Sequence, residues 1–122
     1  MSEHVIDVGD EDRKLVVLAR GASLRAHVPH GGVAAGAAVR DVDGRTYAGA
    51  TVENADPSLT TSALRAAVVA AASSGARRFE AAAVVTAGQL DESELGVLSE
   101  FGPGVPVLVA GPDGVVRETR SS

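Results

Sequence analysis

Residues 43–55 read DGRTYAGATVENA, and no other stretch says as much about the architecture of this chain. An Asp-Gly pair between two runs of strand-forming residues is a strong signal for a β-hairpin, because a type I′ turn requires positive φ angles. The flanking runs extend from Ala35 to Val42 and from Thr46 to Glu53. We therefore predict two strands joined by a type I′ turn at Asp43-Gly44.

Before this hairpin, the sequence predicts a leader, a helix and a loop. Residues 1–11 are acidic without sustained periodicity, so we expect a partly ordered leader followed by a single domain over residues 12–122. Residues 12–26 place Leu15, Leu18, Ala22 and Ala26 on one side of a helix. Gly21 weakens that helix, and residues 14–19 could instead pair as a strand. Residues 27–32 contain a proline and two glycines and predict a loop.

After the hairpin, alternating helices and strands are predicted. Ser58, Thr60 and Thr61 are candidate N-caps of a helix that ends near Ser74 and Gly75. This helix is apolar on almost every side, which indicates burial on more than one face and hence contact between subunits. A continuous apolar strand at residues 79–86 follows, then a helix at 91–101 and strands at 105–110 and 115–118. The order predicts one three-layer α/β domain.

Composition and charge exclude several classes of protein. The chain has 122 residues, 45% of them hydrophobic but only 2% aromatic, so its core must consist of Ala, Val and Leu. No stretch approaches the roughly 20 apolar residues of a membrane span, and the first residues do not resemble a secretory signal. We expect a cytoplasmic protein without membrane association. A net charge of −5 with scattered basic residues argues against binding to nucleic acid.

Several motifs together resemble the small homotetrameric, zinc-dependent cytidine deaminases. Their run APYS-x-F-x-VGAAL falls on residues 28–39, DGKxYxG on 43–49, xENA on 52–55, CAERTA on 62–67 and SEF on 99–101. The similarity covers about residues 12–119, nearly without gaps between Pro29 and Gly75. It implies a three-layer α-β-α fold with a mixed five-stranded sheet. It also implies a homo-oligomer, with a tetramer favoured.

The resemblance also locates the zinc site of that family, where three ligands hold the metal and a glutamate moves the proton. The first ligand falls on Ser62, the glutamate on Leu64, and the remaining ligands on Asp91 and Glu94. The chain has no cysteine, and a leucine can neither bind metal nor transfer a proton. We therefore expect a degenerate site with no catalytic residue, no zinc and no other cofactor.

The same residues allow other interpretations. Asp91 and Glu94 match a capping box, and Ser62 suits a helix start. A site for a hard cation could form from Ser62, Asp91 and Glu94. A Ser62 nucleophile with His30 as base would lack a third orienting group. Both His27 and His30 lie in the glycine- and proline-containing loop, where solvation or hydrogen bonding to the backbone is expected.

The resemblance also implies that part of the family's nucleoside-binding pocket is retained. The ribose-binding Asn and Glu of the family fall on Thr51 and Glu53, and its ring-stacking Phe falls on Val33. Ala63 completes the predicted ligand-binding set. Glu53 fits a surface carboxylate at a strand end equally well.

The sequence leaves three functions open. The leading hypothesis is a non-catalytic binding or interaction protein that retains some affinity for a nucleoside-like small molecule. The second is an enzyme that uses the same pocket for metal-free or non-zinc chemistry. The third is cytidine deamination through a site that the sequence does not reveal.

Overall fold

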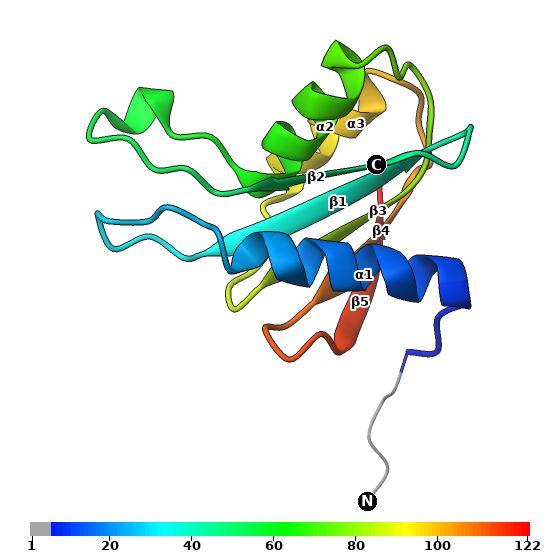
Figure 1. The fold of residues 1–122 in the computed structure, drawn as a ribbon, viewed down its shortest axis with the longest axis horizontal. Helices are drawn as coiled ribbons and strands as arrows, with labels where there is room; N and C mark the ends of the chain where they lie inside the picture. The colour runs from blue at the N-terminus through cyan, green and yellow to red at the C-terminus, as the bar shows by residue number, and fades with distance from the viewer. Residues whose placement is uncertain (1–5) are drawn as a thin grey trace, which may run out of the picture.

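The computed structural model describes residues 6–122, in which helices cover both faces of a five-stranded sheet (Figure 1). Helix α1 (Asp10–Ser23) lies on one face. Helix α2 (Ala63–Ser73) and the short α3 (Gly96–Ser99) lie on the other. The predicted three-layer α/β fold is confirmed. Within the described part of the chain, no helix is long and apolar enough to cross a membrane.

The sheet has the order β2-β1-β3-β4-β5. Its strands are β1 (Ala35–Asp41), β2 (Thr46–Ala50), β3 (Phe79–Thr86), β4 (Pro106–Ala110) and β5 (Val116–Ser121). Only β3 and β4 run parallel, so the sheet is mixed, as predicted. Parallel neighbours need a crossover connection, and the segment between β3 and β4 supplies it. This crossover forms one wall of the pocket described below.

The hairpin is confirmed, but its turn is not of type I′. Gly44 has a φ of 85°, and no non-glycine residue among residues 6–122 has a positive φ, so Asp43 cannot supply the second positive angle. The Gly44 N–H donates to the Asp41 carbonyl at 3.0 Å. The Asp41 carboxylate accepts from the N–H groups of Asp43 and Arg45 at 3.0 and 2.9 Å. A buried aspartate therefore closes the turn together with the glycine.

Strand β2 ends at Ala50, three residues before its predicted end. Val52 instead makes isolated bridges to His27 and Thr61. The first residue of the predicted loop at 27–32, His27, is therefore bridged to the chain that follows β2.

The helical prediction for residues 12–26 is confirmed, and the alternative strand at 14–19 is wrong. The helix begins within the predicted leader and ends three residues earlier than expected. Its buried residues are Leu15, Val16, Ala19 and Ala22, whereas Leu18 is 41% exposed. The predicted stripe was wrong at that position because i, i+4 and i+7 from Leu15 reach Ala19 and Ala22. Residues 1–5 of the predicted leader lie outside the described residues.

The predicted third helix is only partly helical. A 3₁₀-helix, η2 (Glu92–Leu95), precedes the four residues of α3. Asp91 accepts hydrogen bonds from Ser93, two residues on, which favours the tighter 3₁₀ turn. Within the described residues, the Glu94 side chain makes no return bond to Asp91, so the predicted capping box is half formed. Leu95 and Leu98 are buried as predicted, and Phe101 is half-buried.

Alanine and glycine allow the layers to approach closely. Ala37, Ala63, Ala67 and Ala71 contribute to the core under α2, and Ala19, Ala38, Ala81 and Ala83 to the core under α1. Gly49 of β2 lies against α2, where a Cβ atom would come within 2.5 Å of the Ala67 nitrogen. The core is aliphatic as predicted, apart from Phe79, which is buried in the cluster under α2.

Candidate functional site

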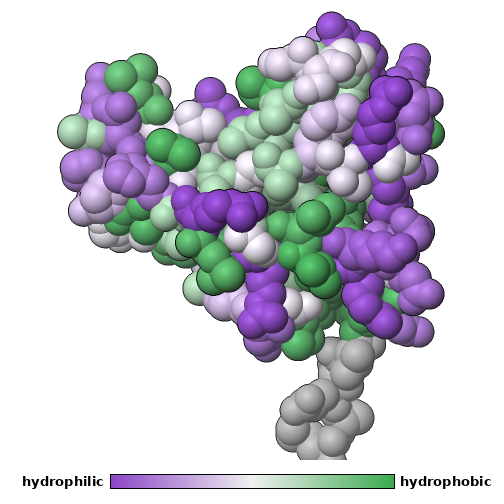
Figure 2. All heavy atoms as spheres, viewed as in Figure 1, coloured by the Kyte–Doolittle hydropathy of each residue, from purple (hydrophilic) through white to green (hydrophobic). Residues whose placement is uncertain are grey.

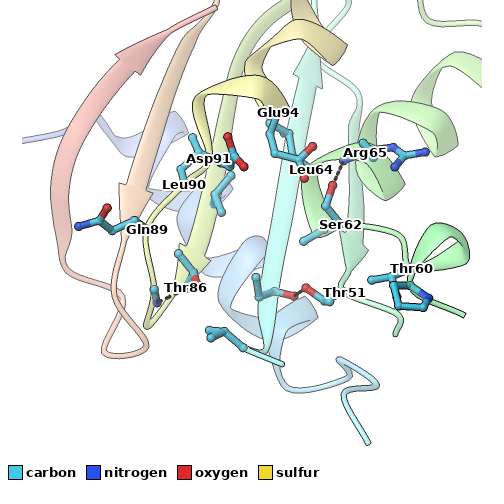
Figure 3. A pocket seen from close by; sticks show the side chains of 16 residues that line it. Thr51, Thr60, Ser62, Leu64, Arg65, Thr86, Gln89, Leu90, Asp91 and Glu94 are labelled. Carbon is cyan, nitrogen blue, oxygen red and sulfur yellow. Dashed lines mark hydrogen bonds between the residues drawn. The ribbon is translucent and has the colours of Figure 1, made fainter. Parts of the chain in front are cut away.

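A pocket of about 420 Å³ opens between the start of α2 and the crossover after β3 (Figure 3). Three parts of the chain line it: the beginning of β1 with the end of the hairpin, the approach to α2, and the end of β3 with the crossover. Its lining residues are Val33, Ala35, Thr51, Pro57, Thr60, Ser62, Ala63, Leu64, Arg65, Val84, Thr86, Gly88, Gln89, Leu90, Asp91 and Glu94.

The α2 side of the pocket is built by the helix start. The Ser62 hydroxyl accepts from the Arg65 N–H at 3.3 Å and caps the helix, which confirms the capping interpretation for Ser62. Leu64 and Ala63 follow in the first turn and are buried. The unpaired N–H groups of this turn carry partial positive charge. The Arg65 side chain is exposed, and Figure 3 shows its guanidinium group pointing away from the carboxylates.

The opposite side of the pocket is acidic. Asp91 accepts from the Ser93 N–H at 3.0 Å and from the Ser93 hydroxyl at 2.9 Å. These bonds, the backbone bond first, hold the pKa of Asp91 below its ordinary value, so its carboxylate is charged at neutral pH. Glu94 is half-buried. Figure 3 shows both carboxylates on the crossover side, facing the wall that carries Ser62 and Arg65.

The turn that follows β3 forms a third wall. The Thr86 hydroxyl accepts from the Gly88 N–H at 3.1 Å, and Gln89 and Leu90 follow in the pocket lining. Arg117 of β5 donates to the carbonyls of both Thr86 and Gly88 at 3.0 Å. Sequence reasoning missed Thr86, Gln89 and Arg117. One signal was available, because ligands in open α/β sheets bind beyond the carboxyl ends of parallel strands, where Thr86 and Gln89 lie.

The structure gathers seven of the eight residues named from the sequence. The degenerate positions Ser62, Leu64, Asp91 and Glu94 all line the pocket, as do Thr51, Val33 and Ala63. Glu53 does not, because its carboxylate accepts from the His30 N–H at 2.8 Å and holds the 27–32 loop. His30 is also absent from the lining, so no Ser62–His30 pair forms there.

The lining determines what kind of ligand the pocket suits. It includes four hydroxyl side chains, one amide, two carboxylates and one guanidinium group, but no aromatic ring. A bound ring would therefore be held by hydrogen bonds and aliphatic contact rather than by stacking. A carboxylate is well matched to an amino group or a protonated ring nitrogen.

The donor set of this pocket does not fit zinc. Protein zinc sites use cysteine and histidine, with carboxylates as additional ligands, and here only two carboxylates and hydroxyl groups are present. Across residues 6–122, no three His, Cys, Asp or Glu side chains come together where they could hold a metal ion. For a hard cation, the pocket offers only two carboxylates, Asp91 and Glu94, and no third one.

Comparisons with known proteins agree with one another. The family described as "Cytidine deaminase-like" matches residues 8–114. A cytidine deaminase from Sporosarcina psychrophila is 36% identical over 111 residues, which cover 87% of this chain and 82% of that protein. A cytidine deaminase structure from Burkholderia pseudomallei superposes with a TM-score of 0.81 at 31% identity, covering 88% of this chain and 90% of that one. One from Mycobacterium tuberculosis gives 0.73 at 34% identity, with 92% and 91% covered.

These relatives correct the leading hypothesis from the sequence. All of them are named for an enzyme, which contradicts the prediction of a non-catalytic binding or interaction protein. They agree better with the second hypothesis, an enzyme that works in the same pocket. The error arose because the missing ligands were equated with missing catalysis, although two carboxylates, Asp91 and Glu94, line the pocket.

Proposed function

This chain belongs to the cytidine deaminase-like family, and from that premise we propose that it is a hydrolytic enzyme acting on an aminopyrimidine nucleoside or a similar amino-substituted ring. The observation that carries the proposal is Glu94, a half-buried carboxylate that lines the pocket together with Leu64. The related deaminases carry, at the position of Leu64, the glutamate that moves the proton. A carboxylate from the crossover reaches the same pocket from another element.

The proposed reaction replaces an amino group with an oxygen. Glu94 takes a proton from water while the water oxygen forms a bond to the ring carbon that carries the amino group. The proton passes to the adjacent ring nitrogen. The hydroxyl proton of the resulting adduct then moves through Glu94 to the amino group, the carbon–nitrogen bond breaks, and ammonia leaves. Proton transfer by a positioned carboxylate contributes roughly 10²- to 10⁴-fold to such rates.

Other groups in the pocket have supporting roles in this proposal. Asp91 remains ionised and accepts a hydrogen bond from the substrate amino group. The N–H groups of the first turn of α2 offset the negative charge that develops on the attacking oxygen. Thr51 and Thr60 offer hydroxyl groups to the sugar or its counterpart.

The proposal derives no step through zinc, because the pocket lacks a zinc-type donor set. The same proposal includes the loss of the family's catalytic groups: its zinc ligands at positions 62, 91 and 94 are replaced by Ser62, Asp91 and Glu94, and its glutamate by Leu64. Without a metal to lower the pKa of the attacking water, turnover is expected to be slow relative to a zinc enzyme.

A homo-oligomer, with a tetramer favoured, also belongs to the proposal. Val69 of α2 is 57% exposed, and Ala70 beside it is exposed. Figure 2 shows weakly and strongly hydrophobic atoms over α2 on the viewed face. Exposed apolar surface on a helix of small residues supports contact between subunits. A location in the cytoplasm remains a prediction.

The test is ammonia release from cytidine, deoxycytidine and cytosine by protein purified in the presence of a zinc chelator. The chelator suppresses zinc-dependent host deaminases, so the remaining activity belongs to this chain. Glu94→Gln should lower kcat by about 100-fold or more. Glu92→Gln is the matched control, since Glu92 lies in the same 3₁₀-helix but outside the pocket lining.

Two results would refute the proposal. One is the absence of ammonia from all three compounds at high protein concentration. The other is a Glu94→Gln variant as active as the Glu92→Gln control.

A further inference from the structure

Arg117 lies outside the pocket lining but holds the wall that follows β3. One nitrogen of its guanidinium group, Nη2, donates to the Thr86 carbonyl and to the Gly88 carbonyl, each at 3.0 Å. The arginine is contributed by β5, an edge strand of the sheet, which is separated from β3 by β4. The contact therefore connects the sheet edge to the turn across a neighbouring strand.

The two carbonyls lie where the chain leaves the sheet. The register between β3 and β4 ends with Val85 opposite Ala110, so Thr86 lies beyond the last pair of that parallel ladder. The turn is closed locally by the Gly88 N–H, which donates to the Thr86 hydroxyl. Arg117 supplies the remaining bonds from outside, and hydrogen bonds from a charged donor are stronger than neutral ones.

The anchored turn leads directly into the functional wall. Gln89, Leu90 and Asp91 follow Gly88 without interruption, and all three line the pocket. Asp91 then caps η2, which carries Glu94. A shift of the turn would be transmitted to both carboxylates, because only two residues separate Gly88 from Asp91.

We infer that Arg117 is a positioning residue that fixes the segment 86–91, and through it the acidic side of the pocket. Its effect on turnover rests on the proposed function, whereas its effect on the order of the segment does not. The planar guanidinium group offers several donors in fixed directions. A lysine at this position offers a single charged point and should replace it only in part.

The experiment compares Arg117→Met, Arg117→Lys and Arg120→Met with the wild-type protein. Arg120 is the matched control, because it lies on the same strand and pairs with Glu118 at 3.5 Å. Amide hydrogen exchange at Gly88, whose N–H donates to the Thr86 hydroxyl, should be at least about tenfold faster in Arg117→Met, intermediate in Arg117→Lys and unchanged in Arg120→Met. If Arg117→Met does not fold, the comparison of Arg117→Lys with Arg120→Met decides.

Turnover provides the second readout. Arg117→Met should lower kcat by roughly 10- to 100-fold, with a smaller change in KM, because Glu94 loses its alignment with the attacking water. Added guanidinium at millimolar concentration should restore part of the rate in Arg117→Met and none in Glu94→Gln.

The two proposals fail in different ways. If the wild-type protein releases no ammonia, the proposed function is refuted, and hydrogen exchange still decides the role of Arg117. Unchanged exchange at the Gly88 amide in a folded Arg117→Met variant would overturn the inference. An equal increase in Arg120→Met would also overturn it, because the effect would then be a general loosening of β5.

Discussion

The Gly49→Ala substitution adds one methyl group between β2 and α2, and the structure predicts a loss of stability from that single atom. The new Cβ would lie 2.5 Å from the Ala67 nitrogen and 2.7 Å from the Ala66 Cβ. Ordinary contact begins near 3.4 Å, so strand and helix would have to separate by about 0.9 Å. The nearest atom belongs to the backbone and cannot rotate away.

Overpacking of this kind costs about 1–3 kcal/mol of unfolding free energy. In a domain of this size the melting temperature should fall by roughly 4–12 °C. Urea denaturation gives the free energy, and differential scanning calorimetry gives the melting temperature. Because Ala66 and Ala67 directly follow the turn that carries Ser62 and Arg65, ammonia release should fall as well.

Gly21→Ala is the control with the opposite sign. Gly21 lies inside α1, and a Cβ built there meets nothing within 4 Å. Alanine is favoured over glycine in a helix by about 0.5–1 kcal/mol, so this variant should be slightly more stable than the wild type. Gly49→Ala within about 0.5 kcal/mol of the wild type would refute the close contact between β2 and α2.

Three further predictions test the site and the assembly. Zinc binding, measured by elemental analysis, should appear in the variant that combines Ser62→Cys, Leu64→Glu, Asp91→Cys and Glu94→Cys. Leu64→Glu alone should not bind zinc. A folded quadruple variant without zinc would contradict the alignment of the crossover. Val69→Glu should dissociate the proposed oligomer, measured by light scattering, because a carboxylate would be buried unpaired; in a monomer the exposed position would tolerate it within about 0.5 kcal/mol. The Asp91 cap should be complete above the ordinary aspartate pKa of about 3.9 and be lost as the pH falls through its lower folded value. The Ser93 amide resonance should therefore titrate with a midpoint below about 3.9, and a midpoint at or above that value would show that the cap does not form in solution.

The sequence predicted the framework well because local patterns determine it. The strand at residues 79–86 has the bounds that its apolar run predicted, and the hairpin lies where Asp43-Gly44 indicated. The type of turn was not predictable in the same way. It depends on the buried Asp41 carboxylate, a contact that no spacing rule reveals.

The crossover was the least predictable element. Its periodicity suggested one continuous helix, but Asp91 bonds to Ser93 and starts a 3₁₀ turn instead. The prediction for Leu18 failed for a related reason, since residues 15–19 of α1 are all apolar and their exposed side cannot be assigned without the packing partners. The first error concerns which element forms, and the second concerns which neighbour a side chain meets; both depend on contacts that the sequence pattern does not show.

The pocket was predicted only in part. The resemblance led to Ser62, Leu64, Asp91 and Glu94, which the fold brings together although nearly thirty residues separate Leu64 from Asp91. It did not reveal Thr86, Gln89 or Arg117, because the role of Arg117 depends on the sheet order that places β5 two strands from β3. The functional error had another cause, the assumption that a site without its metal ligands has no chemistry.

The glycines under the two helices have a consequence for how such a protein can change over generations. Gly36 lies against the backbone of α1, and Gly49 lies against the backbone of α2, so neither position has room for a larger residue. The turn after β3 is held by hydrogen bonds instead, and a Cβ atom built on Gly88 would meet its nearest neighbour, Val33, at an ordinary 3.6 Å. A side chain is therefore excluded by the neighbouring backbone at Gly36 and Gly49 but has room at Gly88, so the hairpin and the pocket turn place different steric demands on sequence change.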